Sequence, residues 1–447
     1  MGRASHQRAL EVWANGEHVA TWRLPSRRPM ELVYTEGWLD SPRVRPLSLS
    51  LPLGVSGSVL SGERVENFFR NLLPDSEAIR RRMASKFRVA TPDAFDLLEA
   101  VGRDCVGALQ LLPPGIEPVG FNRVQALPLS EKEVAEHLRR TVASAGLGSP
   151  QNDDDFRISL AGAQEKSALL WFTDQWCMPH GATPTTHIMK LPLGTVGHTV
   201  KVDMSTSVEN EWLCARILRA YGLVVAQSWI ETFEDQKVLV VERFDRRWAP
   251  DGSWIVRLPQ EDFCQANGLA PTMKYEVDGG PGFGTIAEQL TKSTQAQTDR
   301  SDFLTSQVLF WMLAAIDGHA KNFSIRLLPH GRYQLTPFYD VLSAWPVVGK
   351  GRNKWPKQKL TMAMAVEGTN RHYHWGQIQR RHFNHMARKH GYNLGAEAQI
   401  QHLIEATPGV IQEVGKQLPA DFPQSLADAI FKGLSSSALA LSRMTES

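Results

Sequence analysis

Asp317 and Asn322 stand five positions apart in the segment Asp-Gly-His-Ala-Lys-Asn, and this pair constrains the fold more than any other feature of the chain. An apolar segment of helical character, 303–316, precedes the pair, and an apolar segment of strand character, 323–328, follows it. The catalytic aspartate and metal-binding asparagine of a kinase loop have the same offset. Such a pair arises by chance about once in a chain of this size, so its interpretation depends on the neighbouring elements.

A second carboxylate, Asp340, ends the segment Leu335-Thr-Pro-Phe-Tyr-Asp340, which we expect to close a strand. Considered alone, Asp340 fits equally well as a turn or helix cap before Val341. It follows Asp317 and Asn322 in the order that a phosphoryl-transfer site requires. We therefore interpret Asp317 as the catalytic base, and Asn322 and Asp340 as oxygen ligands of Mg²⁺.

Lys190 lies in an apolar strand predicted over 186–190, where an ammonium group is costly unless it meets an anion. A triphosphate is such an anion, and the alternative is an edge lysine that reaches water. We expect Glu211, on the helix that runs to about Ala220, to pair with Lys190. Glu209 is the rival, although Thr206 and Glu209 have the spacing of a capping box at the start of that helix.

A short loop between two predicted strands precedes Lys190, and it is the candidate phosphate loop. It has only one glycine and therefore matches neither a glycine-rich kinase loop nor a Walker A motif. Its small residues nevertheless let backbone amides approach phosphates, whereas without this context it would be a polar hairpin. The loop consists of Ala161, Gly162, Ala163, Gln164, Glu165 and Lys166.

The composition is that of a globular protein, with 42% hydrophobic residues and a net charge of +2 that gives no global field for nucleic acid or membrane. The four cysteines are far apart, which argues against a zinc site or a disulfide framework. No signal-type or membrane-spanning run is present, so we expect a cytoplasmic protein.

The first region predicts a small α+β unit. Asn15-Gly16 favours a hairpin, and Leu47, Leu49 and Leu51 alternate with serines as in a half-buried strand. Pro74 ends a helix that begins near Asn67, and Asp75 or Ser76 can cap the next one; a polar helix is expected near 130–145. We predict an α+β fold with an N-terminal subdomain over 1–146 and a bilobal, protein-kinase-like core over 147–447, divided into nucleotide-binding elements at 147–245 and a mostly helical lobe at 246–447.

Several segments closely resemble the HipA family of toxin kinases, and the likeness spans nearly the whole chain. In the first region they are Pro46-Leu-Ser-Leu-Ser-Leu-Pro-Leu53 and Asn71-Leu-Leu-Pro-Asp-Ser76. In the second they are Arg157-Ile-Ser-Leu-Ala-Gly-Ala-Gln-Glu-Lys166, Pro184-Thr-Thr-His-Ile-Met-Lys190, Val241-Glu-Arg-Phe-Asp-Arg-Arg-Trp248, Lys274-Tyr-Glu276 and the two segments that carry Asp317, Asn322 and Asp340.

The resemblance implies an ATP- and Mg²⁺-dependent serine/threonine kinase that phosphorylates itself at Ser159. It implies phosphate contacts from Lys190 and the 161–166 loop, and an adenine-side hinge at Glu242, Arg243 and Phe244. It also adds three nucleotide contacts: His319, Lys321 and Tyr339. The implied partners are a helix-turn-helix antitoxin resembling HipB, operator DNA bound mainly through that antitoxin, and glutamyl-tRNA synthetase as the protein substrate.

The segment 350–390 contains ten Lys or Arg residues and a single acid, Glu367, among several aromatic residues. It is either a solvated basic face or a strip that touches DNA phosphates, with Arg380 and Arg381 as the expected contacts. Two other functional classes share part of the pattern. One is a small-molecule kinase of the aminoglycoside or choline type, and the other is a DNA-bound corepressor that has lost catalysis.

Overall fold

The first element of the fold is the hairpin that Asn15-Gly16 predicts. Both residues have positive φ, 51° and 82°, which asparagine and glycine adopt more easily than other residues. They join β1 (Arg8–Ala14) to β2 (Glu17–Leu24) in an antiparallel pair. The computed structural model describes residues 8–142, 160, 164–196, 201–351 and 353–446.

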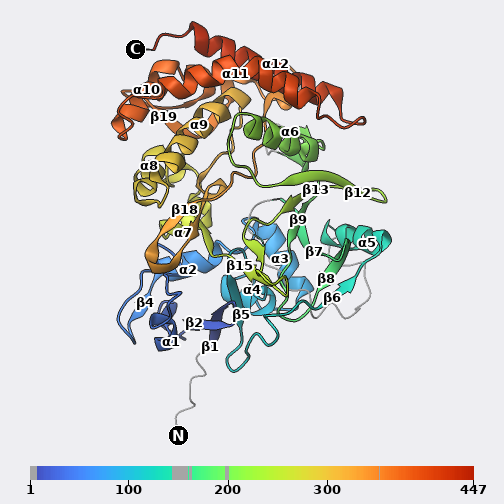
Figure 1. The fold of residues 1–447 in the computed structure, drawn as a ribbon, viewed down its shortest axis with the longest axis vertical. Helices are drawn as coiled ribbons and strands as arrows, with labels where there is room; N and C mark the ends of the chain where they lie inside the picture. The colour runs from blue at the N-terminus through green and yellow to red at the C-terminus, as the bar shows by residue number, and fades with distance from the viewer. Residues whose placement is uncertain (1–7, 143–159, 161–163, 197–200, 352, 447) are drawn as a thin grey trace.

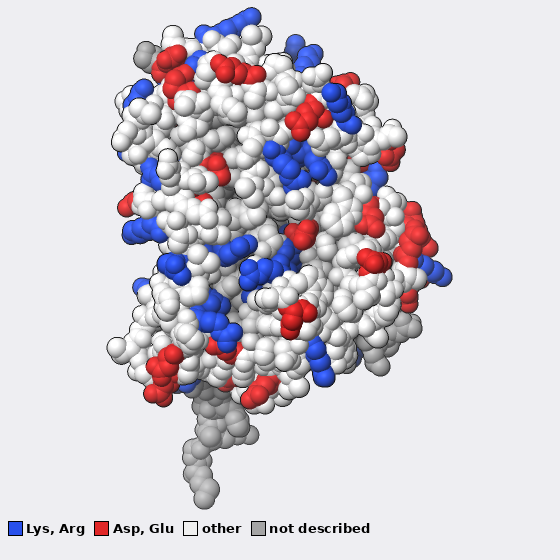
Figure 2. All heavy atoms as spheres, in the orientation of Figure 1, with Lys and Arg blue, Asp and Glu red and all other residues white. Residues whose placement is uncertain are grey.

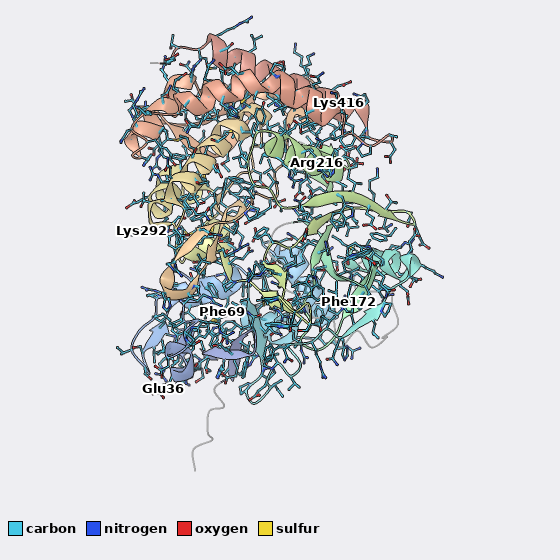
Figure 3. The ribbon with its side chains drawn as sticks, in the orientation of Figure 1. Glu36, Phe69, Phe172, Arg216, Lys292 and Lys416 are labelled. Carbon is cyan, nitrogen blue, oxygen red and sulfur yellow. The ribbon has the colours of Figure 1, made fainter. Side chains whose placement is uncertain are left out.

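The N-terminal unit is an antiparallel sheet in the order β4-β3-β2-β1-β5, with short helices around it (Figure 1). Its buried core includes Trp22, whose ring stacks on Phe69 with centroids 3.8 Å apart. Figure 3 shows Phe69 in this unit, far from Lys416 near the opposite end of the molecule. The remaining elements are β3 (Glu31–Tyr34), α1 (Glu36–Leu39), β4 (Val59–Ser61), α2 (Glu63–Arg70), α3 (Glu77–Lys86), α4 (Ala94–Val101) and β5 (Leu109–Leu112).

Two local predictions in this unit have different outcomes. The cap at the start of α3 is confirmed, because the Ser76 side chain accepts a hydrogen bond from the Ile79 amide. The strand expected around Leu49 is wrong, because the Leu51 amide bonds to the Ser48 carbonyl in a tight turn. The hydroxyl groups of Ser48 and Ser50 both donate to the carbonyl of Gln265, so the turn docks on the second part of the chain.

The second sheet has the order β12-β13-β9-β7-β8-β6. Helix α5 packs against it through buried Val134, Ala135 and Leu138, so residues 126–142 belong with this sheet although they precede the expected boundary at 147. Its elements are β6 (Ala126–Pro128), α5 (Glu131–Val142), β7 (Lys166–Phe172), β8 (Gln175–Pro179), β9 (His187–Lys190), β12 (Ser228–Phe233) and β13 (Gln236–Glu242). Beside it lie β10 (Gly194–Val196), β11 (Val202–Met204), α6 (Ser207–Ala220), β14 (Arg246–Trp248) and β15 (Ile255–Arg257).

The rest of the chain is mostly helical, and α11 and α12 cover the end of the molecule opposite the N-terminal unit (Figure 1). Their apolar faces share one core with α6 and α9. The elements are β16 (Gln260–Asp262), α7 (Phe263–Ala266), α8 (Phe283–Gln289), α9 (Ala296–Leu313), β17 (Ser324–Leu327), β18 (Tyr333–Leu335), β19 (Thr361–Glu367), β20 (Arg371–His374), α10 (Arg380–Lys389), α11 (Glu397–Gly415) and α12 (Gln424–Arg443), with short 3₁₀ helices between them.

A buried ionic cluster joins the N-terminal unit to the second sheet. Asp104 pairs with Arg243 at 3.2 Å, Arg246 at 2.9 Å and Arg257 at 3.3 Å, and Asp245 neutralises part of the remaining charge. Buried charges are tolerated only when they are paired and hydrogen-bonded, so this cluster fixes how the two parts meet. Within the described ranges, the helices include none with the length and apolarity needed to cross a bilayer.

Candidate active site

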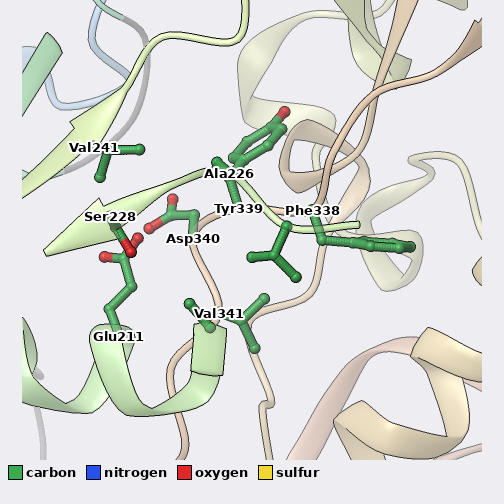
Figure 4. A pocket seen from close by; sticks show the side chains of 10 residues that line it. Glu211, Ala226, Ser228, Val241, Phe338, Tyr339, Asp340 and Val341 are labelled. Carbon is green, nitrogen blue, oxygen red and sulfur yellow. The ribbon is translucent and has the colours of Figure 1, made fainter. Parts of the chain in front are cut away.

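Lys190, Glu211 and Asp340 converge between the second sheet and the helical part. The Lys190 Nζ donates to Glu211 Oε1 at 2.6 Å and to Asp340 Oδ1 at 2.8 Å. Strand β9 supplies the lysine, and α6 supplies Glu211, which points toward Asp340 in Figure 4. The expected Lys190–Glu211 pair is therefore confirmed.

Glu209 pairs with a different lysine. Its carboxylate bonds to Lys237 at 2.8 Å, and Thr206 makes no side-chain hydrogen bond at the start of α6. The predicted capping box is wrong, because Thr206 has φ −94° and ψ 22° rather than the extended conformation that capping requires.

A second lysine lies beside Lys190 in the neighbouring strand. Lys166 opposes Lys190 directly in the β7–β9 register, which places the two side chains on the same face of the sheet. Burial and repulsion from Lys190 lower the pKa of Lys166 to about 8. No carboxylate of the described residues forms an ion pair with Lys166, although attraction to Asp340 and Glu211 partly offsets the fall in its pKa.

Asp340 carries negative charge in this site. Burial opposes ionisation, but attraction to Lys190 and Lys166 outweighs it and holds the pKa of the carboxyl well below its usual range. The residue has φ 60°, a left-handed conformation that is costly outside glycine and asparagine or aspartate. Asp340 is an aspartate, so this conformation carries little strain at the predicted metal ligand.

Asp317 and Asn322 occupy the turn between α9 and β17. The Asn322 side-chain amide donates to the Asp317 carbonyl at 3.0 Å and to the Asp340 carbonyl at 3.4 Å. The amide nitrogen is thus used by these two carbonyl groups, which leaves the amide oxygen as the atom that a cation would contact. The exposed Asp317 accepts a hydrogen bond of 2.6 Å from the hydroxyl of Tyr275.

The described oxygen donors suit Mg²⁺ that is bound together with phosphates. No group of three or more His, Cys, Asp or Glu side chains arranged to hold a metal occurs in the part of the chain that the structure describes. Mg²⁺ typically uses one or two carboxylates, an amide or water, and the phosphates of its nucleotide. The Oδ2 of Asp340 and the Oδ1 of Asn322 fit that requirement.

A cavity lies beside Asp340. Figure 4 shows it between Glu211, Val241, Phe338 and Val341. Tyr339 also lines it, and the Tyr339 ring lies 5.7 Å from that of Phe244, just after β13. The expected hinge segment therefore reaches the same site as Asp340, with Glu242 exposed at the end of β13.

Only part of the predicted phosphate loop lies within the described residues. Gln164 donates to the Leu191 carbonyl, and Glu165 pairs with Arg82 of α3 in the N-terminal unit. The other expected residues, Ser159 and Ala161 to Ala163, lie outside the described ranges.

The contacts of several predicted nucleotide ligands argue for other roles. The Lys321 ammonium is buried against Asn71 and Asp262, at 2.6 and 3.1 Å, and therefore joins the N-terminal unit to the core. The Arg243 guanidinium is held in the buried ionic cluster, so its side chain does not face a nucleotide. His319 is buried, and its Nδ1 has no hydrogen-bond partner in the described structure. The Tyr339 hydroxyl bonds inward to Ser324 and to the Lys321 carbonyl.

The predicted DNA contact at Arg380 is wrong. Arg380 is buried at the start of α10, where it pairs with Glu397 and bonds to the Leu441 carbonyl. Arg381 is exposed. Basic and acidic side chains are interspersed over the face shown in Figure 2, with basic groups gathered near its centre.

Comparisons with known proteins agree with this arrangement. Models of the HipA N-terminal domain and the HipA-like C-terminal domain match residues 10–112 and 158–414. The chain belongs to the HipA family. Sequence relatives include "Putative kinase Y4mE" of Sinorhizobium fredii, 34% identical over 75% of this chain and 77% of that protein. The serine/threonine-protein kinase toxin HipA of Shewanella oneidensis is 28% identical over 69% of each chain.

The comparison with solved structures finds a similar fold. A chain from the solved complex of Shewanella oneidensis HipA, HipB and operator DNA matches with a TM-score of 0.77 at 23% identity, over 96% of both chains. The predicted HipA-like α+β fold is therefore confirmed.

Two residues near Asp317 make contacts that the sequence did not predict. Tyr275 falls in a segment that resembles the HipA family, but no local pattern indicates its bond to Asp317. Asp75 was expected only as a possible helix cap, yet it pairs with Lys274 at 3.2 Å. These contacts join residues that are far apart in the sequence, so no periodic pattern of residue types indicates them.

Proposed function

We propose that this HipA-family protein is an ATP- and Mg²⁺-dependent serine/threonine kinase and the toxin of a toxin-antitoxin pair. The observation that carries this proposal is the convergence of Lys190, Glu211 and Asp340 beside Asp317 and Asn322. Together they provide a phosphate-binding cation, a carboxylate that orients it, oxygen donors for a metal, and a base. The kinases among its relatives support the same reaction.

Each residue has a defined task in this reaction. Lys190 and Lys166 bind the nucleotide phosphates, and Glu211 keeps the Lys190 ammonium charged and oriented. Asp340 and Asn322 would hold Mg²⁺, which neutralises charge on the phosphates when bound. Asp317 accepts the proton of the attacking hydroxyl while the γ-phosphoryl group passes to its oxygen and ADP leaves.

Ser159 is the proposed site of self-phosphorylation, as the family resemblance implies. It lies two positions before the candidate phosphate loop in sequence, so a phosphate there would place about two negative charges near the groups that bind ATP. Competition with ATP would then switch the kinase off. The end of this loop contacts the N-terminal unit, because Glu165 pairs with Arg82.

The proposed partners follow the family. We propose an antitoxin resembling HipB, which brings the protein to operator DNA for repression of its own operon, and a cytoplasmic location alongside that DNA. The relative solved with HipB and operator DNA supports this assembly. Glutamyl-tRNA synthetase is the proposed protein substrate, whose phosphorylation would block charging and arrest growth.

The experiment is incubation of the purified chain with ATP and Mg²⁺, followed by phosphate mapping with mass spectrometry. We expect one phosphate at Ser159 in the wild type and none in the Asp317→Asn variant. Transfer to glutamyl-tRNA synthetase should disappear in the same variant. Transfer to a small metabolite without self-labelling would instead indicate a small-molecule kinase. Absence of any transfer, with operator repression intact, would indicate a corepressor.

A further inference from the structure

The turn between α2 and α3 of the N-terminal unit reaches the catalytic segment 317–322. Asp75 in this turn pairs through Oδ2 with Lys274 at 3.2 Å, and its Oδ1 lies 3.6 Å from the Lys321 ammonium. Asn71, at the end of α2, accepts a 2.6 Å bond from the same ammonium. Two lysines of the core are thus held by one turn of the other unit.

Lys274 continues directly into the catalytic segment. Its carbonyl accepts a hydrogen bond of 3.2 Å from the Ala320 amide. The next residue, Tyr275, donates to Asp317 Oδ1 at 2.6 Å, and its ring meets that of His319 edge-on with centroids 5.2 Å apart. The position of Lys274 therefore determines where Tyr275 holds the Asp317 carboxylate.

The salt bridge between Asp75 and Lys274 is largely buried, so its loss should have a larger effect than the loss of an exposed surface pair. The side chains of Asp75 and Lys274 are only 13% and 15% exposed. The Oδ1 of Asp75 is buried without a hydrogen bond among the described residues. Removal of its charge would leave the Lys274 ammonium without that counterion, next to the residue that orients Asp317.

We propose that Asp75 is a positioning residue for the kinase, which acts through Lys274 and Tyr275 on the Asp317 carboxylate. The N-terminal unit thereby supplies part of the active-site framework. This inference rests on the proposed kinase function. Asp75 would affect the orientation of the base, Asp317, while Lys190 and Lys166 bind the nucleotide phosphates.

The test compares Asp75→Asn with the wild type in steady-state phosphoryl transfer, with nucleotide affinity measured separately by calorimetry. Because a displacement of about 1 Å at a reacting group can cost about 100-fold in rate, we expect kcat to fall by about 10- to 100-fold. The Kd for the ATP analogue should stay within about twofold. The matched control is Glu77→Gln, an exposed carboxylate on the same helix end, which should leave both values unchanged.

A double-mutant cycle with Lys274→Met separates positioning from general stability. If Asp75 acts through Lys274, Lys274→Met should add little to the fall in kcat that Asp75→Asn causes. If the two substitutions act independently, their fold losses in kcat should multiply in the double variant. Asp75→Glu should recover part of kcat. An active wild type with unchanged kcat in Asp75→Asn, or with multiplicative losses in the cycle, would overturn the inference alone. A wild type without any transfer would overturn the proposed function together with it.

Discussion

Replacement of Asp104 by asparagine should destabilise the protein by about 3–5 kcal/mol, the typical cost of removing one partner from a buried ion pair. Asp104 is 5% exposed and faces the guanidinium groups of Arg243, Arg246 and Arg257. With Asp245 these groups form a cluster of three positive and two negative charges. The substitution raises its net charge from one positive to two at a site that is almost closed to solvent.

Asparagine retains the size of the side chain and can still accept the bond that the Thr185 amide now donates at 3.0 Å. The expected loss is therefore due to charge and not to a cavity. Urea unfolding followed by tryptophan fluorescence measures it, since the chain contains 13 tryptophans. Asp428→Asn, on the exposed face of α12, is the control and should change stability by less than about 0.5 kcal/mol. A loss below about 1 kcal/mol for Asp104→Asn would refute the reasoning.

The dependence of the stability on pH gives an independent check of the role of Asp104. Burial opposes ionisation of Asp104, but the three arginines outweigh it and hold the pKa of this carboxyl well below its usual range. Its stabilising effect is complete above the unfolded-state pKa of about 3.9 and is lost as the pH falls toward the folded-state pKa. Asp104→Asn should therefore lose less stability than the wild type between about pH 4 and pH 2.

Three further predictions concern the site and its surroundings. Lys190→Met should lower kcat by about 100-fold or more in a phosphoryl-transfer assay, because it removes a phosphate-binding charge; activity within about threefold of the wild type would contradict the assignment. ATP affinity should fall as the pH rises above about 8, where Lys166 loses its proton, and calorimetry on Lys166→Met should show no such fall. Burial raises the pKa of Glu261 to about 8, so its stabilising effect should be lost as the pH rises from about 4.3 through 8. Glu261→Gln should flatten that part of the stability profile, and an unchanged profile would count against a neutral Glu261.

The order of local motifs was sufficient to predict that Lys190, Asn322 and Asp340 lie close together. Lys190 was recognisable because a lysine in an apolar strand needs an anion, and Asp317 and Asn322 because their spacing falls between a helix and a strand. These inferences needed only residues close together in sequence. The resemblance to the HipA family extended them to the whole chain.

Contacts between distant segments could not be predicted in the same way. The alternation of leucines with serines around Leu49 has the period of a strand, but Ser48 and Ser50 instead bond to Gln265. Arg380 stood in a basic segment, but Glu397 and α12 bury it. In each case the deciding partner lies elsewhere in the sequence, and tertiary contacts override the local pattern.

Calorimetric titration with a non-hydrolysable ATP analogue, with and without Mg²⁺, tests the convergence of these residues on one magnesium nucleotide most directly. We expect the wild type to bind one analogue per chain, at least about tenfold more tightly with Mg²⁺, a gain of about 1.4 kcal/mol. Asp340→Asn should bind the analogue with an affinity that no longer depends on Mg²⁺. An Asp340→Asn variant that keeps the full Mg²⁺ dependence, or a wild type that binds no nucleotide, would contradict the assignment of the site.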